Sequence, residues 1–130
     1  MGKITLQSIF DKAWEAFVIG DNDPGYDKNL GQCVYVDGKG NKCAVGLSLP
    51  ENSELQGNRE GFSELYDLFP ELFDIDETFD LDLDDFQYAL HDNHVDSDTG
   101  YWKNTKEDRK AAYLTAAEDY GLETSHLPGA

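Results

Sequence analysis

Residues 32–47 read QCVYVDGKGNKCAVGL, and this stretch has the clearest secondary-structure pattern in the chain. β-Branched and aromatic residues favour a strand over Gln32–Asp37, and a returning strand is expected over Lys42–Leu47. The intervening Gly38-Lys39-Gly40-Asn41 has the composition of a tight turn. The sequence therefore predicts a β-hairpin, Gln32–Leu47, as the base of a small antiparallel sheet.

Four helices are predicted around this hairpin from apolar residues that recur at helical spacing. Thr5 is a suitable N-cap for the first, Asn104 or Thr105 is suitable for the last, and Gly121 fits the residue after its end. The fold class is thus expected to be α+β, a small antiparallel sheet built on one β-hairpin and packed with about four helices. The helices are expected near residues 6–19, 63–69, 82–92 and 105–120.

The length and composition predict one domain, 1–130, with residues 122–130 as a loose tail. With 130 residues, of which 39% are hydrophobic, the chain can build one core. No apolar run approaches the ~20 residues of a membrane span, and the first residues lack the apolar block of a signal peptide. We therefore expect a cytoplasmic protein without membrane contact. Two cysteines are too few for a disulfide scaffold, and we predict no Cys33–Cys43 disulfide.

The acidic residues are concentrated in one segment, Glu60–Trp102, which contains no Lys or Arg. Of the formal net charge of −17, −14 lies in this segment. Such a field repels phosphates, which excludes direct nucleic-acid binding, and attracts cations or basic surfaces. The carboxylates of the segment are Glu60, Glu64, Asp67, Glu71, Asp74, Asp76, Glu77, Asp80, Asp82, Asp84, Asp85, Asp92, Asp96 and Asp98.

Within this segment, apolar and acidic residues alternate over Phe73–Asp84. A period of two predicts an extended segment with one buried and one solvated face. From about Asp82 the period becomes helical, and acids in the first turn suit the helix dipole. We expect Phe79, Leu81, Leu83 and Phe86 to anchor the segment to the core.

Several short motifs resemble a family of small uncharacterised proteins found in bacteriophages and prophages. The likeness rests on Cys33-Val34-Tyr35, Lys42-Cys43-Ala44-Val45-Gly46 and Leu49-Pro50, and on the first helix, Ile4–Lys12. It extends to His91-Asp92 with Trp102 and Gly121-Leu122. The resemblance implies a phage or mobile-element context, with a host-cell cytosol as the location, and it implies no activity. The additional acid between Glu71 and Asp98 departs from the family pattern.

Two kinds of metal site can be read from the sequence, and neither pattern is complete. Asp96-x-Asp98-x-Gly100 with Glu107 resembles a calcium loop, but Tyr101 stands where such a loop needs Gly. Asp21-x-Asp23-x-Gly25 is a weaker version, and both also read as Asp-rich turns. For a transition metal, His91 and His94 at i, i+3 are candidate ligands, with Asp92, Asp96 or a cysteine. We expect no metal site here, with Cys33 and Cys43 as small core residues and the two histidines closing a helix.

The sequence does not mark a catalytic site. Cys–His catalysis needs a thiolate beside a base, and nothing local indicates that either cysteine is activated. Gly38-x-Gly40 is a turn and not a phosphate-binding loop. We therefore expect a protein that is not an enzyme and that needs no cofactor.

The functional hypothesis from the sequence is a DNA mimic. Carboxylates ~6–7 Å apart along an extended chain can fill a basic channel that normally holds the phosphate backbone. With a phage context, this predicts an inhibitor of a host DNA-binding defence nuclease, an anti-restriction or anti-CRISPR protein. The alternatives are an acidic adaptor that binds a basic protein without blocking DNA, and a calcium- or zinc-binding protein. The expected partner-binding residues are Asp74, Asp76, Glu77, Asp80, Asp82, Asp84, Asp85, Asp92, Asp96 and Asp98.

Overall fold

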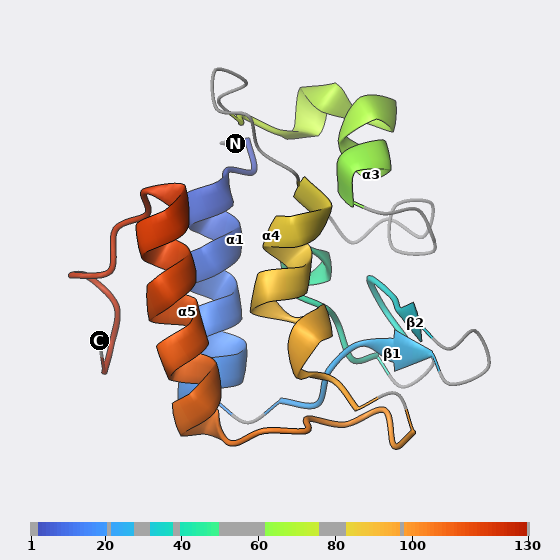
Figure 1. The fold of residues 1–130 in the computed structure, drawn as a ribbon. Coiled ribbons are helices and arrows are strands. Elements are labelled where there is room, and N and C mark those ends of the chain that lie inside the picture. The colour runs from blue at the N-terminus through green and yellow to red at the C-terminus, as the bar shows by residue number, and fades with distance from the viewer. Residues whose placement is uncertain are drawn as a thin grey trace.

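The computed structural model describes residues 3–20, 22–27, 32–37, 40–49, 62–75, 83–96 and 98–129, and helices dominate them (Figure 1). The α-helices are α1 (Leu6–Ala13), α3 (Phe62–Leu68), α4 (Leu83–Leu90) and α5 (Lys106–Tyr120). Shorter helical turns are η1 (Trp14–Ile19), η2 (Gly46–Ser48), η3 (Pro70–Leu72) and η4 (Asp92–His94). The strands are β1 (Tyr26–Asp27) and β2 (Gln32–Cys33).

The first helix begins at a capping box and continues as a wider π-helical turn. The Thr5 hydroxyl accepts a hydrogen bond from the Ser8 backbone N–H, and the Ser8 side chain accepts one from the Thr5 N–H. These two bonds satisfy N–H groups that a helix start leaves open. Helix α1 leads directly into η1, so the helix predicted near residues 6–19 and its N-cap are confirmed.

Helix α5 is capped in the same way and lies beside α1 in Figure 1. Thr105 and Asp108 form its capping box, and Gly121 ends it in the left-handed region at φ 67°. Aromatic rings join α5 to both α1 and η1, because Tyr113 lies 5.6 Å from Phe10 and 6.3 Å from Trp14 between ring centroids. The helix predicted near 105–120 is therefore confirmed, with its apolar face in the core.

Helix α4 packs against α5 and places its C-terminal end in the interior. Phe86 meets Tyr120 edge to face at 4.9 Å, and the Tyr113 hydroxyl donates a 2.6 Å hydrogen bond to the Leu90 carbonyl. Leu83, Phe86 and Leu90 are all buried. The helices predicted near 63–69 and 82–92 are confirmed as α3 and α4, the latter ending at Leu90.

The predicted hairpin and fold class are wrong. Strand β2 pairs with the preceding β1, with Tyr26 opposite Cys33, and Val36 forms only an isolated bridge with Lys42. Among the described residues, no sheet is built on Gln32–Leu47, so the mainly helical fold is not the α+β fold that we predicted.

Consecutive burial explains this error. Val34 and Tyr35 are both buried, and so are residues 43–46, whereas a half-buried strand alternates between a buried and a solvated face. Gly46 lies so close to Tyr35 that a Cβ on it would be 2.1 Å from the Tyr35 carbonyl oxygen. The β-branched and aromatic residues of this stretch therefore reflect burial, and the backbone turns into η2.

The chain after α5 packs back onto α1. For the predicted loose tail, 122–130, the structure shows specific contacts within 122–129. The Trp14 indole donates a 2.8 Å hydrogen bond to the Pro128 carbonyl, and Leu127 is buried. The Glu123 N–H also donates to Gln7 Oε1 at 2.8 Å.

Candidate functional site

The predicted acidic surface is described in part. Asp74, Asp84, Asp85 and Asp98 are exposed, and Asp92 and Asp96 are half-buried. Leu83 and Phe86 are buried as predicted. The other predicted positions, Asp76, Glu77, Asp80 and Asp82, and the anchors Phe79 and Leu81, lie outside the described residues.

The outer face of α4 carries two carboxylates and an aromatic side chain. Asp84 and Asp85 are exposed in the first turn, and Tyr88 is 55% exposed one turn later. Asp84 is also tied to α3, because its Oδ1 accepts a 3.1 Å hydrogen bond from the Ser63 N–H. We call these three residues, Asp84, Asp85 and Tyr88, the outer face of α4.

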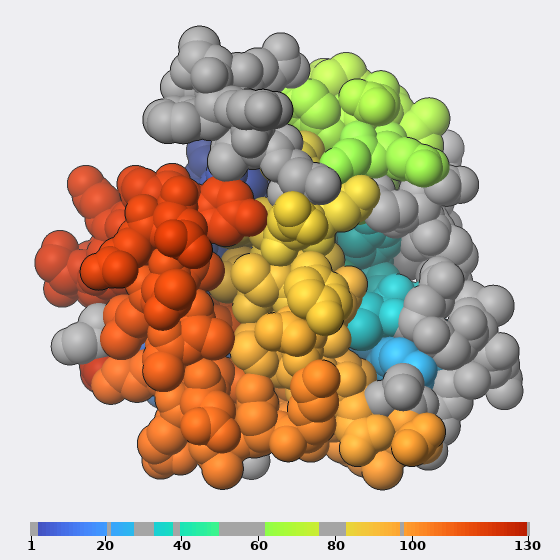
Figure 2. All heavy atoms as spheres, in the orientation of Figure 1, coloured from blue at the N-terminus to red at the C-terminus, as the bar shows by residue number. Residues whose placement is uncertain are grey.

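A groove of about 400 Å³ runs beside this face, between α4 and α5, on the side of the molecule that Figure 2 shows. Small side chains form part of its lining, including Ala89 and Ala112, and Asp85 and Asp119 contribute carboxylates. Glu118 and Asp119 are both exposed in the last turn of α5, so acid extends from α4 onto its neighbour.

A second polar site lies where α4 ends. One ligand atom from each of Cys33, His91 and Asp92 lies within 4.8 Å of the other two. His91 Nδ1 is 3.0 Å from Asp92 Oδ1, and the Cys33 sulfur lies within 4.8 Å of both ligand atoms. We call these three residues the Cys–His–Asp cluster. It joins strand β2 to the end of α4 and the start of η4, two segments distant in sequence.

The surroundings of the cluster hold its side chains in place. Gln87 accepts a 3.1 Å hydrogen bond from the Val45 N–H and donates a 2.8 Å bond to Asp92 Oδ1. The His91 ring lies between aromatic neighbours, 5.5 Å from Phe17 and 5.4 Å from Trp102 between ring centroids. Only Cys33 and Asp92 are partly exposed, while His91 is 0% exposed.

Trp102 is in turn fixed by a buried arginine. The Arg109 guanidinium lies 4.6 Å from the Trp102 ring centroid and donates a 3.0 Å hydrogen bond from Nε to the Phe17 carbonyl. The Trp102 indole donates a 2.8 Å bond to the Asn22 carbonyl. A buried cation that is hydrogen-bonded and stacked on an aromatic ring is satisfied, and it holds the wall of the cluster rigid.

The two thiols are not activated nucleophiles. Burial, and then the neighbouring Asp92 carboxylate, raise the pKa of Cys33 far above its ordinary value. Burial likewise raises the pKa of Cys43 to about 12. A catalytic cysteine needs the opposite environment, one that stabilises the thiolate. The proximity of thiol, imidazole and carboxylate therefore gives no support to Cys–His catalysis.

His94 does not join His91, so the two histidines do not form the candidate ligand pair. The Ala89 carbonyl can only accept a hydrogen bond, so His94 Nε2–H donates to it at 2.9 Å. Nδ1 then accepts from the Asn104 amide at 2.7 Å. Burial lowers the pKa of His94, and the charge of Arg109 lowers it further. His94 is thus a neutral histidine with both ring nitrogens satisfied.

The calcium-like loop is an Asp-rich turn. Asp96 Oδ1 accepts a 2.8 Å hydrogen bond from the Asp98 N–H, and the Asp96 carbonyl accepts one from Gly100. Glu107 is exposed in the first turn of α5. Among the described residues these carboxylates do not gather closely enough to share an ion. Of the weaker loop, Asp21 lies outside the description and Asp23 is exposed.

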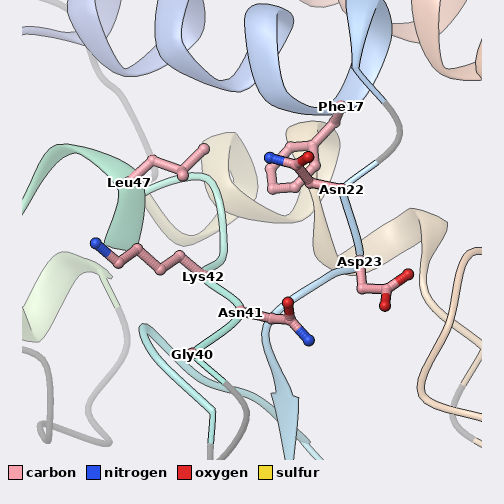
Figure 3. A pocket seen from close by; sticks show the side chains of 7 residues that line it. All are labelled: Phe17, Asn22, Asp23, Gly40, Asn41, Lys42 and Leu47. Carbon is pink, nitrogen blue, oxygen red and sulfur yellow. The ribbon is translucent and has the colours of Figure 1, made fainter.

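A polar pocket of about 350 Å³ lies between the turn at Gly40 and the end of η1. Figure 3 shows that its charged side chains diverge, since Lys42 extends to one side and Asp23 to the other. A ligand site normally presents a few polar groups that converge on one point. This pocket lacks that convergence.

Sequence reasoning missed the role of Cys33 and of Gln87. It named a cysteine as a third ligand without choosing one, and nothing in the spacing identified Gln87. The one available signal was the resemblance to phage proteins, because Cys33, His91-Asp92 and Trp102, on which it rests, meet in this part of the fold.

Comparison with known proteins found no matching protein family, no matching curated sequence and no matching solved structure. The phage-family resemblance therefore stays a prediction. Among the described residues, no helix has the length and apolar character needed to cross a membrane.

Proposed function

We propose that this protein is an acidic inhibitor that imitates DNA and occupies the basic nucleic-acid channel of a partner protein. The observation that carries the proposal is the base-free segment Glu60–Trp102 with its 14 carboxylates. A channel that binds DNA is lined with Lys and Arg, and a surface with dense negative charge is complementary to it.

Exposed acid on α4 supports the proposal. Asp84 and Asp85 are exposed opposite the buried Leu83 and Phe86, so the helix anchors its carboxylates to the core. The neighbouring exposed Tyr88 adds an aromatic side chain of the kind that dominates binding energy in many interfaces.

The acids at the end of α5 support it further. Glu118 and Asp119 lie in the last turn, where the helix dipole is negative and acids are unfavourable by roughly 0.3–1 kcal/mol each. No basic residue offsets them in that turn. Acids in this position do not stabilise the helix, and they extend the negative surface beside the groove.

The proposed partner is a DNA-binding defence enzyme of the host, a restriction or RNA-guided nuclease. Such enzymes share a positively charged channel for the phosphate backbone, which is a common point of inhibition. This choice of partner rests on the phage resemblance in addition to the charge.

Partner capture with charge-reversed variants tests the proposal. We expect the variant Asp74→Lys, Asp84→Lys and Asp85→Lys to lose at least about 100-fold in affinity for a partner captured from host lysate, because like charges then face each other. The control reverses three exposed acids elsewhere, Glu15, Asp23 and Glu123, and changes the net charge equally. Circular dichroism checks that both variants fold.

Equal losses in the two variants would show that only net charge matters and would contradict a defined binding surface. Binding of the wild type should also weaken steeply as salt rises, since exposed charge pairs are screened. A DNA-competition assay distinguishes an inhibitor, which displaces DNA from the partner, from an adaptor that binds a basic protein without blocking DNA.

A further inference from the structure

The Cys–His–Asp cluster has the composition of a transition-metal site. Thiolate, imidazole and carboxylate are the three side-chain groups that bind Zn²⁺, at about 2.0–2.3 Å. Donors around one such ion lie roughly 3–4 Å apart, and the three ligand atoms here are within 4.8 Å of one another. Small side-chain movements would therefore bring them to coordination distance.

The cluster is closed on one side and open on the other. His91 is completely buried, and its Nδ1 atom faces the cluster, 3.0 Å from Asp92 Oδ1. The Asp92 side chain is 33% exposed, which gives an ion a route from solvent and leaves room for water as a further ligand.

A second layer of contacts orients the ligands. Gln87 holds Asp92 through its amide and is itself held by the Val45 N–H. Phe17 and Trp102 fix the plane of the His91 ring. Protein metal sites commonly use such neighbours to set ligand orientation before the ion arrives.

We propose that Cys33, His91 and Asp92 bind one divalent transition ion, Zn²⁺, with solvent at the fourth position. On binding, the ion replaces the thiol proton, which passes to solvent, and a thiolate, a carboxylate and a neutral imidazole balance its charge. Sulfur and nitrogen donors favour Zn²⁺ over the oxygen-seeking Ca²⁺ and Mg²⁺. This site is independent of the acidic surface and of the function proposed for it.

Cobalt titration of the full-length, reduced protein tests the proposal, because Co²⁺ takes the place of Zn²⁺ and absorbs light when bound to a thiolate. We expect one Co²⁺ per chain, a thiolate-to-cobalt charge-transfer band, and loss of that band when Zn²⁺ is added. Cys33→Ser should abolish the band, and Asp92→Asn should weaken cobalt binding at least about tenfold.

Variants outside the cluster supply the matched controls. Asp96→Asn and His126→Ala change the same residue types outside the cluster and should leave the titration unchanged. If Cys33→Ser fails to fold by circular dichroism, Asp92→Asn, at a partly exposed position, decides the outcome. Absence of the band in the wild type, or a band that survives in Cys33→Ser, would overturn the proposal. Displacement of Co²⁺ by an equal concentration of Ca²⁺ would also overturn it, because it would indicate binding by surface carboxylates.

Discussion

On the outer face of α4, Asp84 and Asp85 are exposed, while just beyond the end of the same helix the half-buried Asp92 hydrogen-bonds to Gln87 and His91. The first two carboxylates add charge to an exposed surface, and Asp84 also accepts a hydrogen bond from the Ser63 N–H. Asp92 acts through its position, since its neighbours determine where its oxygens point. One short stretch of chain thus carries exposed carboxylates that add surface charge and a half-buried carboxylate that is held by hydrogen bonds.

The largest expected effect on stability comes from the backbone near the Cys–His–Asp cluster. Gly46→Ala should lower the free energy of unfolding by about 3 kcal/mol, because its Cβ would overlap the Tyr35 carbonyl oxygen. Gly40→Ala is the matched control, since a Cβ at Gly40 meets nothing within 4 Å. Its φ of 85° still predicts a loss of about 1 kcal/mol. Urea unfolding measures both, and equal losses would contradict the close approach.

Two neighbouring residues on α4 give the sharpest comparison between the outer face of α4 and the Cys–His–Asp cluster. Gln87→Ala should cost about 2 kcal/mol, because it leaves the buried Val45 N–H without its acceptor and removes a donor from Asp92. Tyr88→Ala, at the next position, should change stability by no more than about 0.5 kcal/mol. Thermal unfolding of both variants checks this, and a Tyr88 effect as large as that of Gln87 would break the distinction.

The pH dependence of stability tests the buried surroundings of the Cys–His–Asp cluster, which include His94. Burial lowers the pKa of His94, so the unfolded chain takes up a proton near pH 6.5 while the folded chain takes it up only at lower pH. The stability contributed by neutral His94 is complete above the unfolded pKa and is lost as the pH falls toward the folded pKa.

The His94→Gln variant should therefore lose less stability than the wild type when the pH falls from 7.5 to 5.5. The measurement is the difference in the free energy of unfolding between variant and wild type at each of the two pH values. Comparison with wild type removes the general effect of protonating the acidic surface. An unchanged difference at the two pH values would indicate that His94 is not a buried neutral group.

The smallest effect is expected on the exposed side, at the end of α5. Glu118→Lys should stabilise the protein by about 0.5 kcal/mol, because a cation suits the negative end of the helix dipole. The same change should weaken partner binding, since it removes charge from the surface beside the groove. A variant that is more stable and binds equally well would show that the end of α5 lies outside the interface.

Sequence patterns predicted the helices because caps and apolar spacing act locally. Thr5, Thr105 and Gly121 each stand where a helix begins or ends, and the structure uses all three. The hairpin prediction failed because strand-forming residues also occur in buried irregular chain. Consecutive burial of Val34 and Tyr35 depends on what packs around them, which their own sequence does not specify.

The two candidate sites also differ in how far the sequence could predict them. Exposure of Asp84 and Asp85 follows from the helical period, which places them opposite Leu83 and Phe86. The Cys–His–Asp cluster could not be derived from spacing, since Cys33 is far from His91 in sequence and reaches it only through the fold. Nor could spacing show that His94, three residues after His91, turns to Ala89 and Asn104 instead.

Displacement of DNA from the captured partner tests the central claim most directly. Labelled duplex is bound to the partner and titrated with wild-type protein, with the Asp74, Asp84 and Asp85 to Lys variant, and with Cys33→Ser. The account predicts that the wild type and Cys33→Ser release the duplex competitively and that the charge-reversed variant does not. A partner that holds DNA equally well with the wild-type protein attached would contradict the account.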